Sequence, residues 1–259
     1  ELIKNLKDIK HPLIKNSLKL TKLWGLDINS VSDVASGTGL ASSSAFTVGL
    51  LNCLNALNSK FIGRTQLALE SIDLEQNIIK DTARDFILKE AMPLIREAYQ
   101  KEEFPLKLID RFGELGLLGC NLKGYGLPGM DEISYGLVMR ELERCDSGLR
   151  SFASVQGSLV MYPIHSYGSE AQKEEWLPKL ASGEVVGTFA LAEGSGRPSA
   201  DSLNTRFEAG KLTGKKLPVP DGNIADFAVI VTKSDTGDGA SLALVELNQE
   251  AVIKSSVRT

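Results

Sequence analysis

The sequence ELERCDSGLRSFAS, at Glu141–Ser154, joins two stretches of the chain that both have helical periodicity. Apolar residues recur at helical spacing over Asp131–Glu143 and again over Ser151–Tyr162. The sequence therefore predicts a helix on each side of this segment.

Arg150 and Ser154 are the most informative pair of side chains in the segment. They are four residues apart, so on a helix they share one face. A guanidinium fork beside a hydroxyl group is suited to holding a carboxylate. The alternative is an exposed arginine that pairs with Asp146, which is also four residues away.

Helical and strand patterns occupy separate parts of the chain around this segment. Helical periodicity fills Leu106–Gly119, and Ser169 with Gln172 forms a capping box ahead of a further helix. After Gly183 the period changes to two, which is typical of strands. The predicted strands are Val185–Leu191, Thr205–Phe207, Lys211–Lys215, Phe227–Thr232 and Ser241–Leu247. We therefore expect an all-helical block over about Thr82–Ser182 and an antiparallel β domain over about Val185–Val257.

The amino-terminal residues predict a different arrangement. Asp8–Leu23 is amphipathic and helical, and Gly25–Ile28 alternates like a short strand. A glycine- and serine-rich loop over Ala35–Ser44 then opens an apolar helix over Ala45–Leu57, and a further helix begins near Thr65 as its N-cap.

Together these patterns predict an α+β protein, in which an α/β piece is followed by helices and then by antiparallel strands.

The glycine- and serine-rich loop is a candidate phosphate site. Free backbone amides at the start of a helix point outward, and the helix dipole favours negative charge. The loop residues that would contact a phosphate are Gly37, Gly39, Leu40, Ser42, Ser43 and Ser44. The alternative is a tight turn whose serines cap the helix, and the loop by itself leaves both interpretations open.

Composition and charge limit the class of protein. The chain has 259 residues, of which 42% are hydrophobic and 24% charged, and its net charge is −4. This fits a globular protein of one large or two ordinary domains, and it favours neither nucleic acid nor an anionic membrane as a partner. No apolar run approaches the roughly 20 residues of a membrane span. We expect a cytoplasmic protein.

The cysteines and histidines predict neither disulfides nor a metal site. Cys53, Cys120 and Cys145 are widely spaced and odd in number, which favours reduced core thiols. His11 and His165 stand alone, so we expect structural roles for both.

Six blocks of sequence after residue 81 occur in the order seen in one enzyme family. They are TARDF at Thr82–Phe86, FGELGLLG at Phe112–Gly119, GYGLPG at Gly124–Gly129, ELERCDSGLRS at Glu141–Ser151, YGSEAQK at Tyr167–Lys173 and WLPKLASGE at Trp176–Glu184. With these blocks, residues 81–259 resemble the helical and middle β domains of the acyl-CoA dehydrogenases, and especially the glutaryl-CoA type. The resemblance implies a helical domain at 81–183 and an antiparallel β domain at 184–259, after a separate α/β piece at 1–80.

The resemblance implies that two hydrogens leave an acyl-CoA thioester, a proton to a carboxylate and a hydride to FAD. It implies that Phe189 and Leu191 contact FAD, and that Arg150 and Ser154 bind the far carboxylate of a glutaryl-type substrate. The family's base belongs to a carboxy-terminal helical bundle that nothing in this chain matches, so no catalytic residue is assigned. The family is usually homo-oligomeric.

Four positions depart from the flavin segments of the family. Ala192 and Pro198 stand where hydroxyl residues bind the flavin, and Pro218 and Pro220 replace a tryptophan and a threonine of the second segment. An aromatic platform and hydroxyl donors are thereby lost. A β domain without flavin affinity is therefore the alternative to an FAD-binding one.

The sequence GTGLASSSAFTVGLL, at Gly37–Leu51, resembles the phosphate loop of the GHMP small-molecule kinases, and those acting on heptose 7-phosphate in particular. The resemblance covers about residues 8–81 and implies ATP as a ligand. The family has proline and glycine where Ala35 and Ala41 stand, and its catalytic aspartate block does not follow. We therefore expect a fragment without kinase activity that binds ATP weakly or not at all.

Three interpretations of the whole chain follow. The first is a fragment of a flavin-dependent acyl-CoA dehydrogenase that is inactive by itself because the carboxy-terminal bundle is missing. The second is a fragment of an ATP-dependent sugar kinase. The third is a non-catalytic hybrid of the two families.

Overall fold

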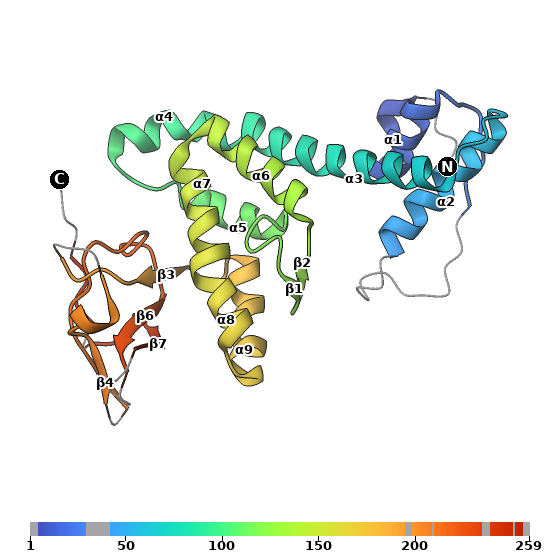
Figure 1. The fold of residues 1–259 in the computed structure, drawn as a ribbon. Coiled ribbons are helices and arrows are strands. Elements are labelled where there is room, and N and C mark those ends of the chain that lie inside the picture. Colours follow the sequence, from blue (N-terminus) through green and yellow to red (C-terminus); the bar gives the residue numbers. More distant parts are fainter. Residues whose placement is uncertain are drawn as a thin grey trace. The chain divides into compact units, whose positions relative to one another are not determined.

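The computed structural model describes residues 5–29, 42–194, 198–208, 210–234, 239–250 and 252–255. The chain divides into two compact units, Glu1–Phe86 (unit 1) and Ile87–Thr259 (unit 2) (Figure 1). Unit 1 is helical in its described part, whereas unit 2 combines helices with a sheet. The prediction of an α+β protein is confirmed.

The described part of unit 1 holds four helical segments. They are η1 (Leu6–Asp8), α1 (Pro12–Thr21), α2 (Ser42–Leu57) and α3 (Arg64–Phe86). Pro12 suits the first position of α1 because an amide there has no partner within the helix. The apolar side chains form two small clusters, one around Leu54 and one around Leu51, each with three buried residues.

The strand predicted at Gly25–Ile28 is absent from the structure. Gly25 forms a bend with φ 69°, and the residues after it are irregular. A short extended segment needs a neighbouring strand for its backbone hydrogen bonds, and the described part of unit 1 holds no strand. The expected α/β piece is therefore helical over its described residues, and Thr65 lies inside α3 instead of capping it.

The first half of unit 2 is helical, as the periodicity predicts. Its helices are α4 (Met92–Lys101), α5 (Lys107–Glu114), α6 (Glu132–Cys145), α7 (Ser147–Ser154), α8 (Tyr162–Tyr167) and α9 (Glu170–Ser182). Local signals set the helix starts. Asp131 accepts hydrogen bonds from the amides of Ile133 and Ser134, both at 2.9 Å, and the predicted capping box of Ser169 and Gln172 is present.

Two stretches of unit 2 are wound as π-helix, η2 (Ile87–Ala91) and η3 (Val155–Met161). The helix predicted over Ser151–Tyr162 is therefore three successive segments, α7, η3 and α8. Each π turn holds more residues than an α turn, and such turns occur often at functional sites. Periodicity alone did not predict this change of winding.

A small hairpin interrupts the block that was predicted to be all-helical. The strand β1 (Lys123–Gly124) pairs antiparallel with β2 (Leu127–Pro128). Tyr125 at its tip has φ 53°, a conformation that residues other than glycine seldom adopt. The hydroxyl of Tyr125 donates a hydrogen bond to Glu170 Oε2 on α9 at 2.7 Å, which fixes the hairpin against the helices.

The second half of unit 2 is a five-stranded sheet. Its strands are β3 (Gly187–Ala190), β4 (Arg206–Glu208), β5 (Lys211–Thr213), β6 (Phe227–Lys233) and β7 (Ala240–Glu246). Strand β6 pairs antiparallel with β7 but parallel with β3 and β4, and β4 and β5 form an antiparallel hairpin.

The prediction of a wholly antiparallel domain is therefore wrong for β3 and β4. The chain leaves β3 by a long connection that contains the β4–β5 hairpin, and such a connection allows β6 to run in the same direction as β3. The 3₁₀ turn η4 (Ala200–Ser202) also lies in this connection, where no helical turn was predicted.

Aromatic contacts join the helices of unit 2 to one another and to its sheet. Phe152 of α7 packs against Phe104 and Phe112, with ring centroids 4.7 and 5.6 Å away. Trp176 of α9 stacks on Phe227 of β6 at 4.3 Å. Phe112, Phe152 and Phe227 are almost completely buried, so the helices and the sheet are packed as one body.

Candidate functional site

Arg150 and Ser154 lie one turn apart on α7, as the sequence predicts. Arg150 Nε donates a hydrogen bond to Glu143 Oε2 on α6 at 2.7 Å, and the arginine side chain is 41% exposed. The expected alternative partner, Asp146, instead caps α7 by accepting from the Leu149 amide at 3.1 Å. The alternative pairing is therefore corrected from Asp146 to Glu143. An exposed pair of this kind contributes only about 0.2–1 kcal/mol, so a ligand carboxylate can displace Glu143 readily.

Phe189 and Leu191 lie in and just after β3. Phe189 is half-buried, and Leu191 has 37% of its surface exposed. The start of β3 is tied to η3 by the amide of Gln156, which exchanges two hydrogen bonds with the backbone of Gly187. The helix that carries Arg150 and the strand that carries Phe189 are thus joined through a residue that the sequence did not single out.

Glu193 is the centre of a polar network that the sequence also did not predict. Its carboxylate accepts hydrogen bonds from the amides of Asn204 and Thr205, at 2.7 and 2.9 Å, and from Lys216 Nζ at 2.9 Å. The side chains of Glu193 and Lys216 are 13% and 7% exposed. Burial by itself would raise the pKa of Glu193, but the bonds from Lys216 and the backbone outweigh it and hold that pKa well below its ordinary value.

The two segments that the resemblance assigns to flavin are bonded to each other. Leu217 N donates to Ala192 O at 2.8 Å, and Gly194 N donates to Leu217 O at 2.9 Å. Lys216 Nζ also donates to Leu191 O at 3.0 Å. Residues 192–194 and 217 therefore form a parallel bridge with their own backbone groups.

The side chains at this bridge do not fit a flavin ring as the resemblance implies. Ala192, Pro198, Pro218 and Pro220 offer no side-chain donor, and none of them is aromatic. The hydroxyl group of Thr188, which lies in β3, donates to the carbonyl of Pro220. The described residues of the two segments thus supply apolar surface and already bonded polar groups.

The predicted phosphate loop lies mostly outside the described residues. Gly37, Gly39 and Leu40 are among those not described, and Ser42 and Ser43 are the first residues of α2, about where the helix was expected to begin.

At the described start of α2, Glu75 of α3 accepts hydrogen bonds from Ser44 at 3.1 Å and from the buried Thr47 at 2.7 Å. This carboxylate lies where the helix dipole would favour an anion, so a phosphate without a cation would be repelled. Glu75 stands in the sequence block after the loop but carried no separate signal.

The described cysteines and histidines differ in burial and in their contacts. Cys120 is buried, and burial raises the pKa of its thiol to about 11. Cys53 is exposed, so the expectation of three core thiols is wrong for it. His165 contacts the carbonyl of Lys123 through Nε2 at 2.8 Å, which agrees with a structural role.

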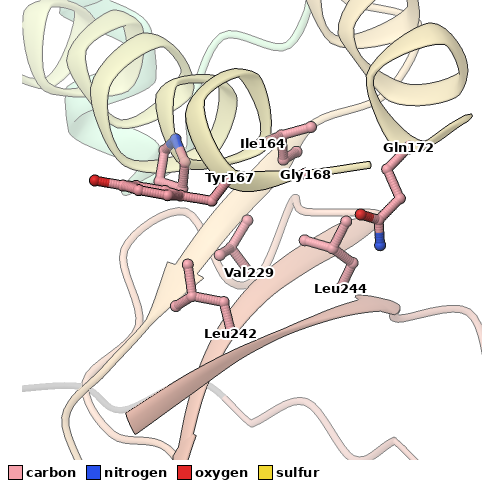
Figure 2. Close-up of a pocket in the computed structure, with 8 residues that line it drawn as sticks. Ile164, Tyr167, Gly168, Gln172, Val229, Leu242 and Leu244 are labelled. Carbon is pink, nitrogen blue, oxygen red and sulfur yellow. The ribbon is translucent and has the colours of Figure 1, made fainter. Parts of the chain in front are cut away.

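The described part of unit 2 has at least two hollows on its surface. One, of about 70 Å³, lies between α8 and the sheet and is lined by Ile164, Tyr167, Val229 and Leu242 (Figure 2). The other, of about 250 Å³, is bordered by α5, α9 and the β1–β2 hairpin. Sites for small molecules usually enclose roughly 300–1,000 Å³, so neither hollow encloses a flavin or a CoA thioester. No helix in the described ranges is long and apolar enough to span a membrane.

Two family models match the chain, and their matches overlap over residues 73–84. Residues 73–184 match the acyl-CoA dehydrogenase N-terminal domain, and residues 9–84 match the GHMP kinases N terminal domain. Both resemblances seen in the sequence are therefore confirmed.

Curated and solved relatives agree with the longer match. An acyl-CoA dehydrogenase of Bacillus subtilis is 36% identical over 182 residues, which cover 67% of this chain and 48% of the relative. The short-chain specific acyl-CoA dehydrogenase of Rattus norvegicus is 28% identical over 187 residues, which cover 70% of this chain and 45% of the relative. A glutaryl-CoA dehydrogenase of Mycobacterium smegmatis, solved in complex with FADH2, is 39% identical with a TM-score of 0.63, over 68% of this chain and 46% of that one. The chain spans about half the length of these relatives.

Proposed function

We propose that this chain, whose carboxy-terminal two thirds resembles the acyl-CoA dehydrogenases, binds a dicarboxylic acyl-CoA through Arg150 and Ser154 but does not dehydrogenate it by itself. In this proposal residues 81–183 and 184–259 are the helical and middle β domains of such an enzyme, and residues 1–80 are a kinase-derived fragment. The observation that carries the proposal is the half-exposed guanidinium group of Arg150, held one turn from Ser154 on a helix that is fixed to β3.

The expected lack of turnover has two physical supports. Removal of the α proton needs a positioned base, and positioned proton transfer is typically worth about 10²–10⁴-fold in rate. Glu193, the carboxylate that follows the strand bearing Phe189, is already bonded to Lys216 and the backbone, and the base of the family belongs to a bundle that the described residues do not match. The flavin segments offer no side-chain donor at four key positions, so we further propose that FAD binds weakly.

The test is binding of glutaryl-CoA and butyryl-CoA to the full chain by titration calorimetry. A carboxylate paired with the half-exposed Arg150 is worth at most about 1 kcal/mol, so Arg150→Ala should weaken glutaryl-CoA roughly 3- to 5-fold and leave butyryl-CoA nearly unchanged. Arg96→Ala, which removes an exposed arginine of α4, is the matched control and should change neither. Equal weakening of both ligands by Arg150→Ala would assign Arg150 a structural role, and turnover with a dye acceptor would overturn the proposed inactivity.

Kinase activity is the second candidate function, and the match of residues 9–84 favours it. We propose that it is absent, because the block with the catalytic aspartate does not follow the loop. Sugar phosphorylation by the chain in the presence of ATP and Mg²⁺ would overturn this. A cytoplasmic location, homo-oligomeric assembly and the absence of nucleic-acid or membrane partners remain parts of the proposal, and light scattering of the purified protein would test the assembly.

A further inference from the structure

Gln156 is a buried amide with an unusual task in unit 2. It lies in η3, is 1% exposed, and accepts a hydrogen bond from Gly187 N at 2.9 Å. The same side chain donates to Gly187 O at 2.7 Å. Both polar groups of one strand residue are therefore satisfied by one side chain.

The backbone amide and carbonyl of Gly187 lie on the edge of β3 that faces away from β6, so they need a partner other than a strand. Val186 O accepts from Phe227 N, so the neighbouring residue Gly187 turns its own amide and carbonyl to the opposite edge of the strand. Gln156 thus stands where an adjoining strand would be. An unbonded amide and carbonyl at a buried strand edge would be costly.

The helix approaches the strand so closely that only glycine fits at position 187. A Cβ atom built on Gly187 would lie 2.5 Å from Cγ1 of Val160, which also belongs to η3. Backbone and helix are therefore in direct contact at this point. Gln156 and Val160 are four residues apart in η3, so they share one face, and both lie against Gly187 of β3.

The two hydrogen bonds between Gln156 and Gly187, called the clamp below, connect the segment that carries Ser154 to the strand that carries Phe189. Gln156 follows Ser154 by two residues, and Gly187 precedes Phe189 by two residues. We propose that Gln156 is a positioning residue that sets the placement of the helix bearing Arg150 and Ser154 relative to the strand bearing Phe189. This positioning role extends the function proposed above and rests on it for the identity of the ligand. The placement of the helix relative to the strand can be measured without any ligand.

Gln156→Glu turns the clamp into one that responds to pH. A protonated glutamate has the shape of glutamine, and its hydroxyl can donate to Gly187 O while its carbonyl accepts from Gly187 N. An ionised glutamate has no donor and repels Gly187 O. Burial raises the pKa of a carboxyl group, so the change should occur above the ordinary glutamate range.

The experiment measures the distance between spin labels on Cys-substituted Ser147 of α7 and Thr213 of β5, in a full chain that also carries Cys53→Ser and Cys145→Ser. The otherwise unchanged chain should give one narrow distance distribution at pH 5 and pH 9. Gln156→Glu should match it at pH 5 and broaden at pH 9. Val138→Ala, which weakens the core away from β3, should stay narrow at both.

A narrow distribution for Gln156→Glu at pH 9 would overturn the positioning role. So would broadening by Val138→Ala to the same extent, because the effect would then be general loss of packing. A second arm compares the preference of Gln156→Glu for glutaryl-CoA over butyryl-CoA at the two pH values, and it should fall at least about 3-fold at pH 9. If the unmodified chain binds neither thioester, the proposed function fails, while the distance measurement still decides the role of Gln156.

Discussion

Units 1 and 2 differ in the size of the buried apolar core among their described residues. In unit 1, Phe61 is fully exposed, and Leu57 and Trp24 are more than half exposed, around two clusters of three buried residues. Unit 2 also exposes apolar side chains such as Tyr99 and Ile253, but its core contains almost completely buried rings such as Phe152 and Phe227. Helices of an α/β fold bury one face against a sheet, and the described part of unit 1 has no sheet. A match to a family therefore does not ensure that the matched segment retains a complete core.

The comparison predicts its largest effect in hydrogen exchange of the full chain. Amides around Leu51 and Leu54 in unit 1 should exchange roughly 100-fold or more faster than those around Phe152 in unit 2, a difference of about 3 kcal/mol. The measurement is exchange followed by proteolysis and mass spectrometry. Equal protection of both sets of amides would contradict the inference that unit 1 has the less stable core.

Two hydrogen-bonded carboxylates, Glu193 in unit 2 and Glu75 in unit 1, should differ in the same way in what they contribute to the free energy of unfolding. Glu193→Gln breaks a buried ion pair in unit 2 and should lower the free energy of unfolding by roughly 2 kcal/mol at pH 7, less than complete removal would because Gln still accepts from the backbone. The pKa of Glu193 is depressed in the folded state, so its contribution is present above the ordinary value and is lost as the pH falls through the folded one. The equivalent change in unit 1, Glu75→Gln, should cost less than about 1 kcal/mol. Urea unfolding of both variants gives the comparison, and a larger loss for Glu75→Gln would reverse it.

Asp221 is a weak point within the well-packed unit. Its Oδ2 atom is buried without a hydrogen-bond partner in the described part of the chain, and burial raises its pKa to about 6. The folded pKa exceeds the ordinary value near 3.8, so ionisation destabilises the fold as the pH rises past 3.8, and the penalty is complete above about 6. Asp221→Asn should therefore raise the free energy of unfolding by roughly 1–2 kcal/mol at pH 8 and by little at pH 4. The same gain at both pH values would show that charge is not the cause.

The smallest expected effect concerns the exposed pair of Glu143 and Arg150. Glu143→Gln should change the free energy of unfolding by less than about 1 kcal/mol, because both side chains are about half exposed. It should also strengthen glutaryl-CoA binding severalfold, since Arg150 no longer has to leave a competing carboxylate. Calorimetry with butyryl-CoA is the control. Unchanged affinity for glutaryl-CoA would mean that Arg150 does not bind the carboxylate of the ligand.

Sequence reasoning was most successful where neighbouring residues decide the structure. The helical period that begins at Asp131 and the capping box of Ser169 and Gln172 depend on residues close together in the chain, and both are present in the structure, as is the change to strands after Gly183. The same holds for Arg150 and Ser154, whose common face follows from helix geometry. Both family resemblances were also legible, because they rest on ordered blocks of residues.

Tertiary structure decided the contacts between residues far apart in the chain. The parallel pairing of β3 with β6, the two bonds of Gln156 to Gly187 and the network around Glu193 join residues separated by 11 to about 40 positions. Neither periodicity nor a local motif encodes such a partner, because a buried amide or carboxylate is satisfied by whatever backbone the fold brings beside it. The sequence by itself thus determined the order of helices and strands and the families they resemble. Only packing determined that residues 192–194 are bonded to residue 217 and that Arg150 is held by Glu143.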